Sequence, residues 1–227
     1  MGTLVEFGSE LNALAEHYYG EDPSRKPDWY LAEYDRLFGC WRDLPIRLLE
    51  LGIQRGHSML IWKEYFPRAT IVGLDCDPRP ERFPQDSRFH FVQGGQDDPA
   101  VLDQAIAAAG APFDIIIDDA SHLGYLTARS FSYLFPLALK RGGIYVIEDI
   151  CTAFRPAGEF DATDYAPAEI GLPEMARVFP SHQHGMVGLM KQLFDHTMAP
   201  IVTGDYTRYA IERMTVLANL AIFHKAA

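Results

Sequence analysis

Two short groups of polar residues in this sequence combine carboxylates with a histidine at a spacing that suits chemistry. The first, residues 118–122, reads Asp-Asp-Ala-Ser-His and follows the largely apolar run 113–117. The second is the pair Glu148 and Asp149, which follows the apolar run 144–147. Carboxylates crowded at one place raise one another's pKa or attract a cation, and an oxygen-rich cluster suits a hard ion such as Mg²⁺.

The first group offers different side chains for different tasks. Successive strand residues face opposite ways, so Asp118 and Asp119 are expected to serve different partners. His122 follows Asp119 by three residues, and a histidine beside a cation is a suitable general base because the cation favours its neutral form. The alternatives are that the aspartates cap a helix or that the histidine is structural.

The runs before these groups are predicted to be buried neighbouring strands of a parallel sheet, about 4.8 Å apart. The carboxyl ends of such strands are where open α/β sheets place their ligands. The four carboxylates should therefore meet at one edge of the sheet.

Strand and helix patterns alternate from Leu44 onward, which predicts a parallel, doubly wound sheet. The expected strands are residues 46–51, 70–74, 89–93, 113–118 and 144–148, and the expected helices are residues 58–66, 99–109 and 126–139. The Gly142-Gly143 pair is expected to be a turn before the fifth strand.

The flanks complete the expected single domain, 1–227. Residues 1–43 should contribute two amphipathic helices as a lid or flank, residues 44–150 the cofactor-binding core, and residues 151–184 a long functional loop. Residues 185–227 should give a helix over 185–196 and then an antiparallel strand pair, from the apolar runs 213–217 and 220–224, at the sheet edge. His182 and His184 in the loop could be ligands, but an exposed loop is the preferred interpretation.

The turn after the first strand reads Glu50-Leu51-Gly52-Ile53-Gln54-Arg55-Gly56 and can bring a ligand close to the backbone. Asp75 follows about twenty residues later, where an acid can accept both ribose hydroxyls of an adenosine. A dinucleotide fingerprint would also need glycine at Gln54 and His57, which weakens an NAD interpretation. Structural packing of the glycines is the alternative.

Composition excludes several classes of protein. The chain of 227 residues carries 20 basic and 31 acidic residues, a net charge of −11, and has no basic run that would suit a nucleic acid. Its three cysteines fit neither a disulfide framework nor a zinc site, and neither a targeting signal nor a membrane span is recognisable. A cytoplasmic protein with a small-molecule substrate is expected.

Three stretches make the sequence resemble a class I S-adenosylmethionine-dependent methyltransferase. They are residues 48–75, the run FDIIIDDASH at 113–122 and GGIYVIED at 142–149. Within that superfamily the chain resembles the metal-dependent sugar O-methyltransferases of macrolide and other natural-product pathways, the mycinamicin type, and the related cephalosporin-hydroxylase-like proteins. The resemblance implies a mostly parallel, seven-stranded, Rossmann-like sheet with N-terminal helices.

The resemblance also implies roles for individual residues. Mg²⁺ would be bound by Asp119, Glu148 and Asp149, and His122 would be the base. The cofactor S-adenosylmethionine would be bound by Glu50, Gly52, Gly56, Asp75, Gly95, Gln96 and Asp118, with Asp118 at its methionine ammonium. One departure is that the flexible Gly-Thr/Ser-Asp-Lys segment of the family corresponds here to Gly20-Glu21-Asp22-Pro23, which lacks the lysine.

The expected function is methylation of a hydroxyl of a sugar or other polyol, as in a glycosylated natural product. The alternatives are a non-catalytic S-adenosylmethionine-binding protein, a methyltransferase for a non-sugar small molecule and, least favoured, an NAD oxidoreductase. The oligomeric state, monomer or homo-oligomer, stays open.

Overall fold

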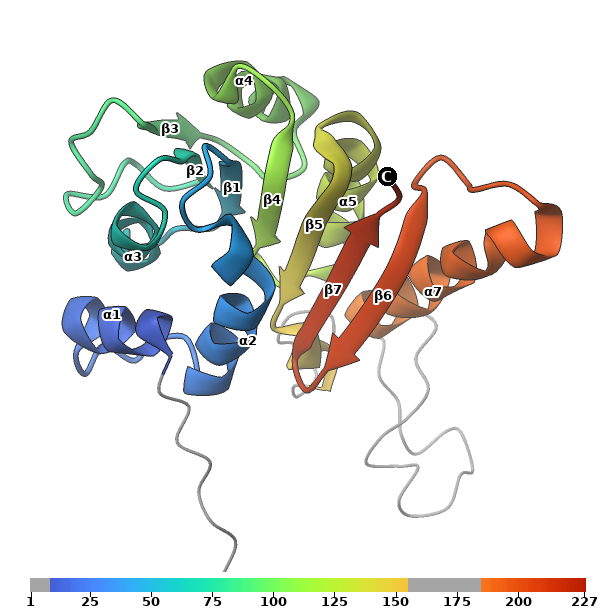
Figure 1. Ribbon diagram of the computed structural model, residues 1–227, viewed down its shortest axis with the longest axis horizontal. Helices are drawn as coiled ribbons and strands as arrows, with labels where there is room; N and C mark the ends of the chain where they lie inside the picture. Colours follow the sequence, from blue (N-terminus) through green and yellow to red (C-terminus); the bar gives the residue numbers. More distant parts are fainter. Residues whose placement is uncertain (1–8, 155–184) are drawn as a thin grey trace, which may run out of the picture.

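A computed structural model of the chain describes residues 9–154 and 185–227. Its centre is a seven-stranded sheet in the order β3-β2-β1-β4-β5-β7-β6 (Figure 1). The strands β1 to β5 run parallel, whereas β7 is antiparallel to β5 and β6 is antiparallel to β7. The strands are β1 (Arg47–Leu51), β2 (Thr70–Asp75), β3 (Phe89–Gln93), β4 (Phe113–Asp118), β5 (Leu139–Glu148), β6 (Ile211–Leu217) and β7 (Leu220–Lys225). This confirms the predicted doubly wound, mostly parallel fold of the class I methyltransferases.

Helices cover both faces of the sheet. They are α1 (Glu10–Tyr19), α2 (Asp28–Phe38), α3 (His57–Tyr65), α4 (Pro99–Ala109), α5 (Gly124–Leu137) and α7 (Gly185–Thr203), with the short 3₁₀ helices η1 (Gly39–Trp41) and η2 (Ile150–Phe154). Helices α1, α2 and α3 share one hydrophobic core, and α4, α5 and α7 share the other. In Figure 1 the arrowheads of β4 and β5 point toward the side of the molecule where α1 and α2 lie.

Successive side chains of β4 and β5 point alternately into the two hydrophobic cores. Ile115 and Ile117 of β4 face the core of α1 to α3, while Ile116 faces the core of α4, α5 and α7. On β5, Val146 belongs to the first core and Ile147 to the second. Because both faces are apolar, residues 115–118 of β4 and 143–148 of β5 are buried, as expected for a parallel sheet between helices.

Two predicted boundaries differ from the structure by more than two residues, and the helix predicted over 126–139 spans 124–137. The fifth strand begins at Leu139, not at residue 144, because Leu139 already pairs with Phe113 of β4. The register shifts between Phe113 and Ile115, and Gly142 lies inside the strand with φ of +73°. A strand with such an irregularity can contain glycines that a sequence pattern assigns to a turn. The helix predicted over 185–196 continues to Thr203.

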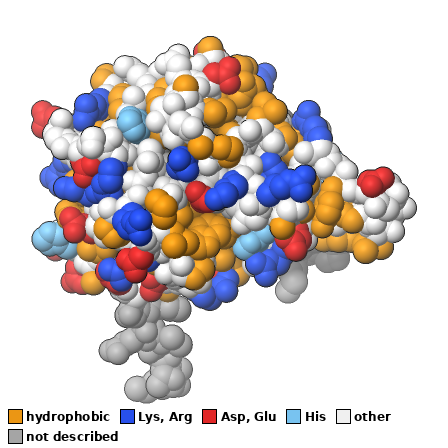
Figure 2. All heavy atoms as spheres, turned by 45° about the horizontal axis from the view of Figure 1, so that its top comes forward, with side chains coloured by type: hydrophobic (Ala, Val, Ile, Leu, Met, Phe, Trp, Pro, Cys, Tyr) orange, Lys and Arg blue, Asp and Glu red, His pale blue; other side chains and the backbone are white. Residues whose placement is uncertain are grey.

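No helix in the described ranges is both long and apolar enough to cross a membrane. On the face that Figure 2 shows, basic side chains are scattered among acidic and apolar ones. Residues 155–184, which include most of the predicted loop together with His182 and His184, lie outside the described residues.

Candidate active site

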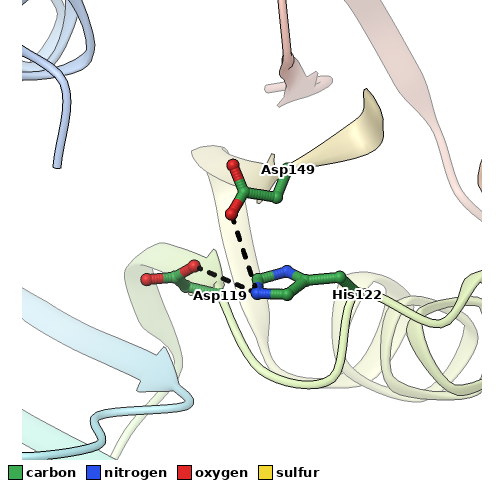
Figure 3. Close-up of side chains that lie close together, drawn as sticks. All are labelled: Asp119, His122 and Asp149. Atoms are coloured by element: carbon green, nitrogen blue, oxygen red, sulfur yellow. Dashed lines mark ion pairs between the residues drawn. The ribbon is translucent and has the colours of Figure 1, made fainter. Parts of the chain in front are cut away.

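Three of the residues singled out from the sequence meet beyond the carboxyl ends of β4 and β5. The imidazole Nε2 of His122 lies 3.9 Å from Asp119 Oδ1 and 3.7 Å from Asp149 Oδ2 (Figure 3). One ligand atom from each side chain lies within 4.8 Å of the others, which is a spacing that could hold a metal ion. The predicted meeting of the two polar groups is therefore present in the structure.

Unusual backbone conformations position two of these side chains. His122 has φ of 56° and Asp149 has φ of 54°, both in the left-handed region that non-glycine residues rarely adopt. Thr152 Oγ1 donates a hydrogen bond to the carbonyl oxygen of His122 at 2.9 Å. Strained residues of this kind persist when surrounding contacts fix them, and they cluster at functional sites.

Asp149 is oriented by two residues that are distant in the sequence. Its Oδ1 accepts hydrogen bonds from the Tyr30 hydroxyl at 2.9 Å and from Asn219 Nδ2 at 2.6 Å. Asn219 lies in the turn between β6 and β7, and its Oδ1 also accepts from the backbone N–H of Cys151 at 2.7 Å. These bonds leave Oδ2 of Asp149 directed at His122.

Glu148 is the last residue of β5, directly before Asp149, and its side chain is buried. Its Oε1 accepts hydrogen bonds from Lys26 Nζ at 2.7 Å and from the Tyr34 hydroxyl at 2.6 Å. Burial and the nearby Asp119 carboxylate raise the pKa of Glu148 to about 8, against the opposing effect of the Lys26 ammonium. Glu148 faces α2 because it follows Val146 on the same side of the strand.

Lys26, like Tyr30 and Asn219, is a residue of this site that the sequence did not reveal. Its ammonium lies 2.5 Å from Asp119 Oδ2, 2.7 Å from Glu148 Oε1 and 3.6 Å from Glu50 Oε1. Burial disfavours its charged form, but the three carboxylates together raise its pKa well above the usual value. Although Gly20-Glu21-Asp22-Pro23 lacks the lysine of the family segment, the chain carries a lysine at this site three residues later.

Two cavities adjoin at Gly52, Gln54 and Asp119. One, of about 250 Å³, is lined by the α1–α2 linker, by Glu148 and by Asp149. The other, of about 230 Å³, is lined by four of the predicted cofactor residues, Gly52, Asp75, Gly95 and Gln96. The structure thus brings most of the predicted cofactor residues to a cavity beside the carboxylate cluster.

Gly52 allows the first turn to approach the loop after β4. Its φ is +80°, and a Cβ atom there would lie 2.2 Å from the carbonyl oxygen of Asp119. Gly56, with φ of +81°, directly precedes α3 and lines neither cavity. Asp75 is fixed by the same turn, because its Oδ2 accepts from the backbone N–H groups of Ile53 at 2.9 Å and Gln54 at 2.8 Å.

Besides Gly56, the predicted cofactor residues Glu50 and Asp118 lie outside both cavities. Glu50 is fully buried, and its Oε2 accepts from Trp62 Nε1 at 2.8 Å. Asp118 follows Ile116 into the core of α5, where its carboxylate accepts from Ser130 Oγ at 2.6 Å, Tyr145 at 3.0 Å and Gln96 Nε2 at 3.1 Å. The expected contact of Asp118 with the methionine ammonium is not supported by this orientation.

The burial of Asp118 predicts a pH dependence of stability. Burial raises its pKa from 3.8 to about 6, so the folded state holds this proton more tightly than the unfolded state. Asp118 therefore stabilises the folded state fully below pH 3.8. This contribution to the free energy of unfolding, on the order of 3 kcal/mol, is lost as the pH rises through about 6. Urea unfolding of the wild type and Asp118→Asn in EDTA should show this fall in the wild type alone. Parallel pH profiles would contradict it.

Known proteins resemble this chain over most of its length. No protein-family model matches the chain. An 8-demethyl-8-(2-methoxy-alpha-L-rhamnosyl)-tetracenomycin-C 3'-O-methyltransferase of Streptomyces olivaceus is 36% identical over 210 residues, which cover 87% of this chain and 49% of that protein. A mycinamicin VI 2''-O-methyltransferase of Micromonospora griseorubida is 38% identical over 153 residues, 63% of this chain and 37% of that protein.

A solved structure agrees with these sequence matches. The MycE methyltransferase of the mycinamycin biosynthetic pathway, in complex with Mg, SAH and mycinamycin VI, superposes with a TM-score of 0.73 and 30% sequence identity. The match covers 96% of this chain and 55% of that one. The chain spans about half the length of the first of these curated relatives and of this structure.

Proposed function

We propose, from the class I methyltransferase fold of this chain and its homology to sugar O-methyltransferases, that it transfers a methyl group from S-adenosylmethionine to a sugar hydroxyl with the help of Mg²⁺. The observation that carries this proposal is the Asp119, His122 and Asp149 cluster next to two adjoining cavities. One cavity would receive the cofactor and the other the acceptor.

The cofactor cavity suits an adenosylmethionine in several respects. Asp75 ends β2 at the cavity wall, where its carboxylate could accept ribose hydroxyls. Gly95 and Gln96 lie on the same wall and could border the adenine. Gly52, which carries no side chain, lets the cofactor approach the backbone between the two cavities.

The carboxylate cluster fits a magnesium ion. Carboxylate oxygens are the ligands that Mg²⁺ prefers, and it commonly takes one or two of them together with water. Asp119 Oδ1 and Asp149 Oδ2 face the same space beside His122. Glu148 Oε1 and Asp119 Oδ2 both contact the Lys26 ammonium, so Glu148 would join the two aspartates as a ligand at the place of that ammonium. Bound there, the ion would lower the pKa of an acceptor hydroxyl.

His122 would act as the general base. Its imidazole is about one-fifth exposed, so an acceptor in the adjoining cavity can reach Nε2. The hydroxyl proton would pass to Nε2 while the oxygen attacks the sulfonium methyl in line, forming the C–O bond as the C–S bond breaks. S-adenosylhomocysteine and the methyl ether are the products, and most of the rate would come from positioning.

The acceptor class follows from the relatives, whose names specify sugar-bearing tetracenomycin and macrolide compounds. A small, sugar-bearing acceptor also agrees with the net charge of −11, which disfavours a nucleic acid. A cytoplasmic location and a division into lid, cofactor core, loop and C-terminal unit belong to the same proposal, and the question of a homo-oligomer stays open.

Methyl transfer to a small panel of glycosides tests the proposal. With labelled S-adenosylmethionine, we expect transfer to at least one acceptor among mycinamicin VI, demethylmacrocin and rhamnosyl tetracenomycin C. EDTA should lower the rate at least about tenfold because the cation no longer stabilises charge on the acceptor oxygen, and excess Mg²⁺ should restore it. A rate unaffected by EDTA would exclude the metal-dependent mechanism.

The alternative of a non-catalytic binding protein predicts a different result. Calorimetry would then show S-adenosylmethionine binding while none of the acceptors is methylated. The proximity of His122 to two carboxylates favours the enzyme, since a binding protein needs no such arrangement.

A further inference from the structure

Lys26 occupies the space between two of the three carboxylates proposed to hold the metal. Its Nζ lies 2.5 Å from Asp119 Oδ2 and 2.7 Å from Glu148 Oε1, and its side chain is only 5% exposed. A Mg²⁺ ion bound to the same two oxygens would lie about 2.1 Å from each and would therefore overlap the ammonium. The two cations cannot use these oxygen atoms at the same time.

A second acceptor for the ammonium lies nearby. Glu50 Oε1 is fully buried and has no hydrogen-bond partner among the described residues, while Oε2 of the same carboxylate accepts from Trp62. Lys26 Nζ is 3.6 Å from this unpartnered oxygen, so a displacement of roughly 1 Å would bring the two within hydrogen-bonding distance. A buried carboxylate oxygen without a donor is costly, which gives the ammonium a reason to move there.

Alternation along three strands explains why one lysine reaches all three carboxylates. Glu50 follows Leu48, Asp119 follows Ile117 and Glu148 follows Val146 on the face that packs against α1 to α3. The linker between α1 and α2, which carries Lys26, crosses the cavity over this face.

We propose that Lys26 is a displaceable internal cation: it neutralises Asp119 and Glu148 when no metal is bound, and it moves to Glu50 Oε1 when Mg²⁺ takes these carboxylates. The inference rests on the proposed metal dependence and adds a positioning residue to it. Lys26 and Glu50 then set the affinity for the metal in opposite directions, although neither is a ligand.

Calorimetric titration of the cofactor-free protein with MgCl₂ tests this directly. Lys26→Met keeps the length of the side chain and removes its charge, so Mg²⁺ should bind at least about tenfold more tightly. Glu50→Gln removes the charge at the second position, so Mg²⁺ should bind several-fold more weakly, by roughly three- to tenfold. In the Lys26→Met background, Glu50→Gln should have little further effect because no ammonium remains to be moved.

Lys140→Met is the matched control. Lys140 forms an exposed ion pair with Asp114 at 2.8 Å, far from the carboxylate cluster, so its replacement should leave the Mg²⁺ affinity unchanged. Circular dichroism checks that each variant is folded. If Lys26→Met does not fold, Glu50→Gln in the wild-type background still tests the proposal.

The outcomes separate this proposal from the proposed function. If the wild type binds Mg²⁺ and Lys26→Met binds it equally or more weakly, competition by Lys26 is wrong while metal dependence stands. An unchanged affinity in Glu50→Gln overturns the movement to Glu50. If neither the wild type nor Lys26→Met binds Mg²⁺, the proposed metal site itself is wrong, and this inference fails with it.

Discussion

Replacing His122 by alanine is expected to lower the rate of methyl transfer by about 10²–10⁴-fold, the range that general bases contribute. The imidazole Nε2 is the nitrogen that lies between Asp119 and Asp149. Without it, the acceptor hydroxyl must lose its proton to water. The turnover of labelled S-adenosylmethionine at saturating Mg²⁺ and acceptor measures the effect.

Two controls separate a lost base from a damaged site. His17→Ala removes an exposed histidine on α1 and should leave the rate unchanged. Calorimetry should show that His122→Ala still binds Mg²⁺ and the cofactor. If His122→Ala methylates at the wild-type rate, the base lies elsewhere and only the carboxylate cluster retains its proposed role.

Replacing Gly52 by alanine is expected to lower the free energy of unfolding by about 2–5 kcal/mol. A left-handed conformation costs an alanine about 1–2 kcal/mol, and a forced contact in a packed region costs about 1–3 kcal/mol more. The contact is severe because the new Cβ would lie 2.2 Å from the carbonyl oxygen of Asp119, and backbone atoms cannot turn aside as a side chain can. Urea denaturation measures the loss.

Gly110→Ala isolates the two contributions. Gly110 has a similar φ of +70°, but no atom of residues 9–154 or 185–227 lies within 4 Å of the added Cβ, so only the conformational cost of about 1–2 kcal/mol should appear. Equal destabilisation by the two substitutions would show that the close approach of Gly52 to Asp119 has little energetic weight. We also expect Gly52→Ala to weaken Mg²⁺ binding, because Asp119 must shift.

The sequence predicted the sheet and the meeting of its polar ends for a physical reason. Buried apolar runs that end abruptly in carboxylates describe neighbouring parallel strands, and β4 and β5 pair as expected. The positions of Asp119, His122 and Asp149 followed from that pairing alone. No contact between distant residues other than this strand pairing was needed to predict that they meet.

The direction of Asp118 could not be predicted, because β4 is apolar on both faces. Alternation places Asp118 and Asp119 on opposite sides, but it does not say which side holds the site. The structure turns Asp119 toward α1 to α3 and Asp118 into the core of α5. Which of the two aspartates faces the site depends on which helices cover each face of the sheet.

Lys26, Tyr30 and Asn219 were missed because their contacts span long stretches of chain. The Lys26 bond to Glu148 joins residues 122 positions apart, and the Tyr30 bond to Asp149 joins residues 119 apart. A lysine in a short polar linker and an asparagine in a turn are ordinary residues at such places. Only the folded arrangement reveals what they contact.

The turn between β6 and β7 bears on protein engineering. Turns at the tip of a hairpin usually accept insertions and exchanges because their backbone is exposed. Here Asn219, in the left-handed conformation with φ of 73°, holds both Asp149 and the backbone of Cys151. A tag, a fused domain or a graft from a relative placed in this turn would therefore disturb the active site without touching any residue that lines it.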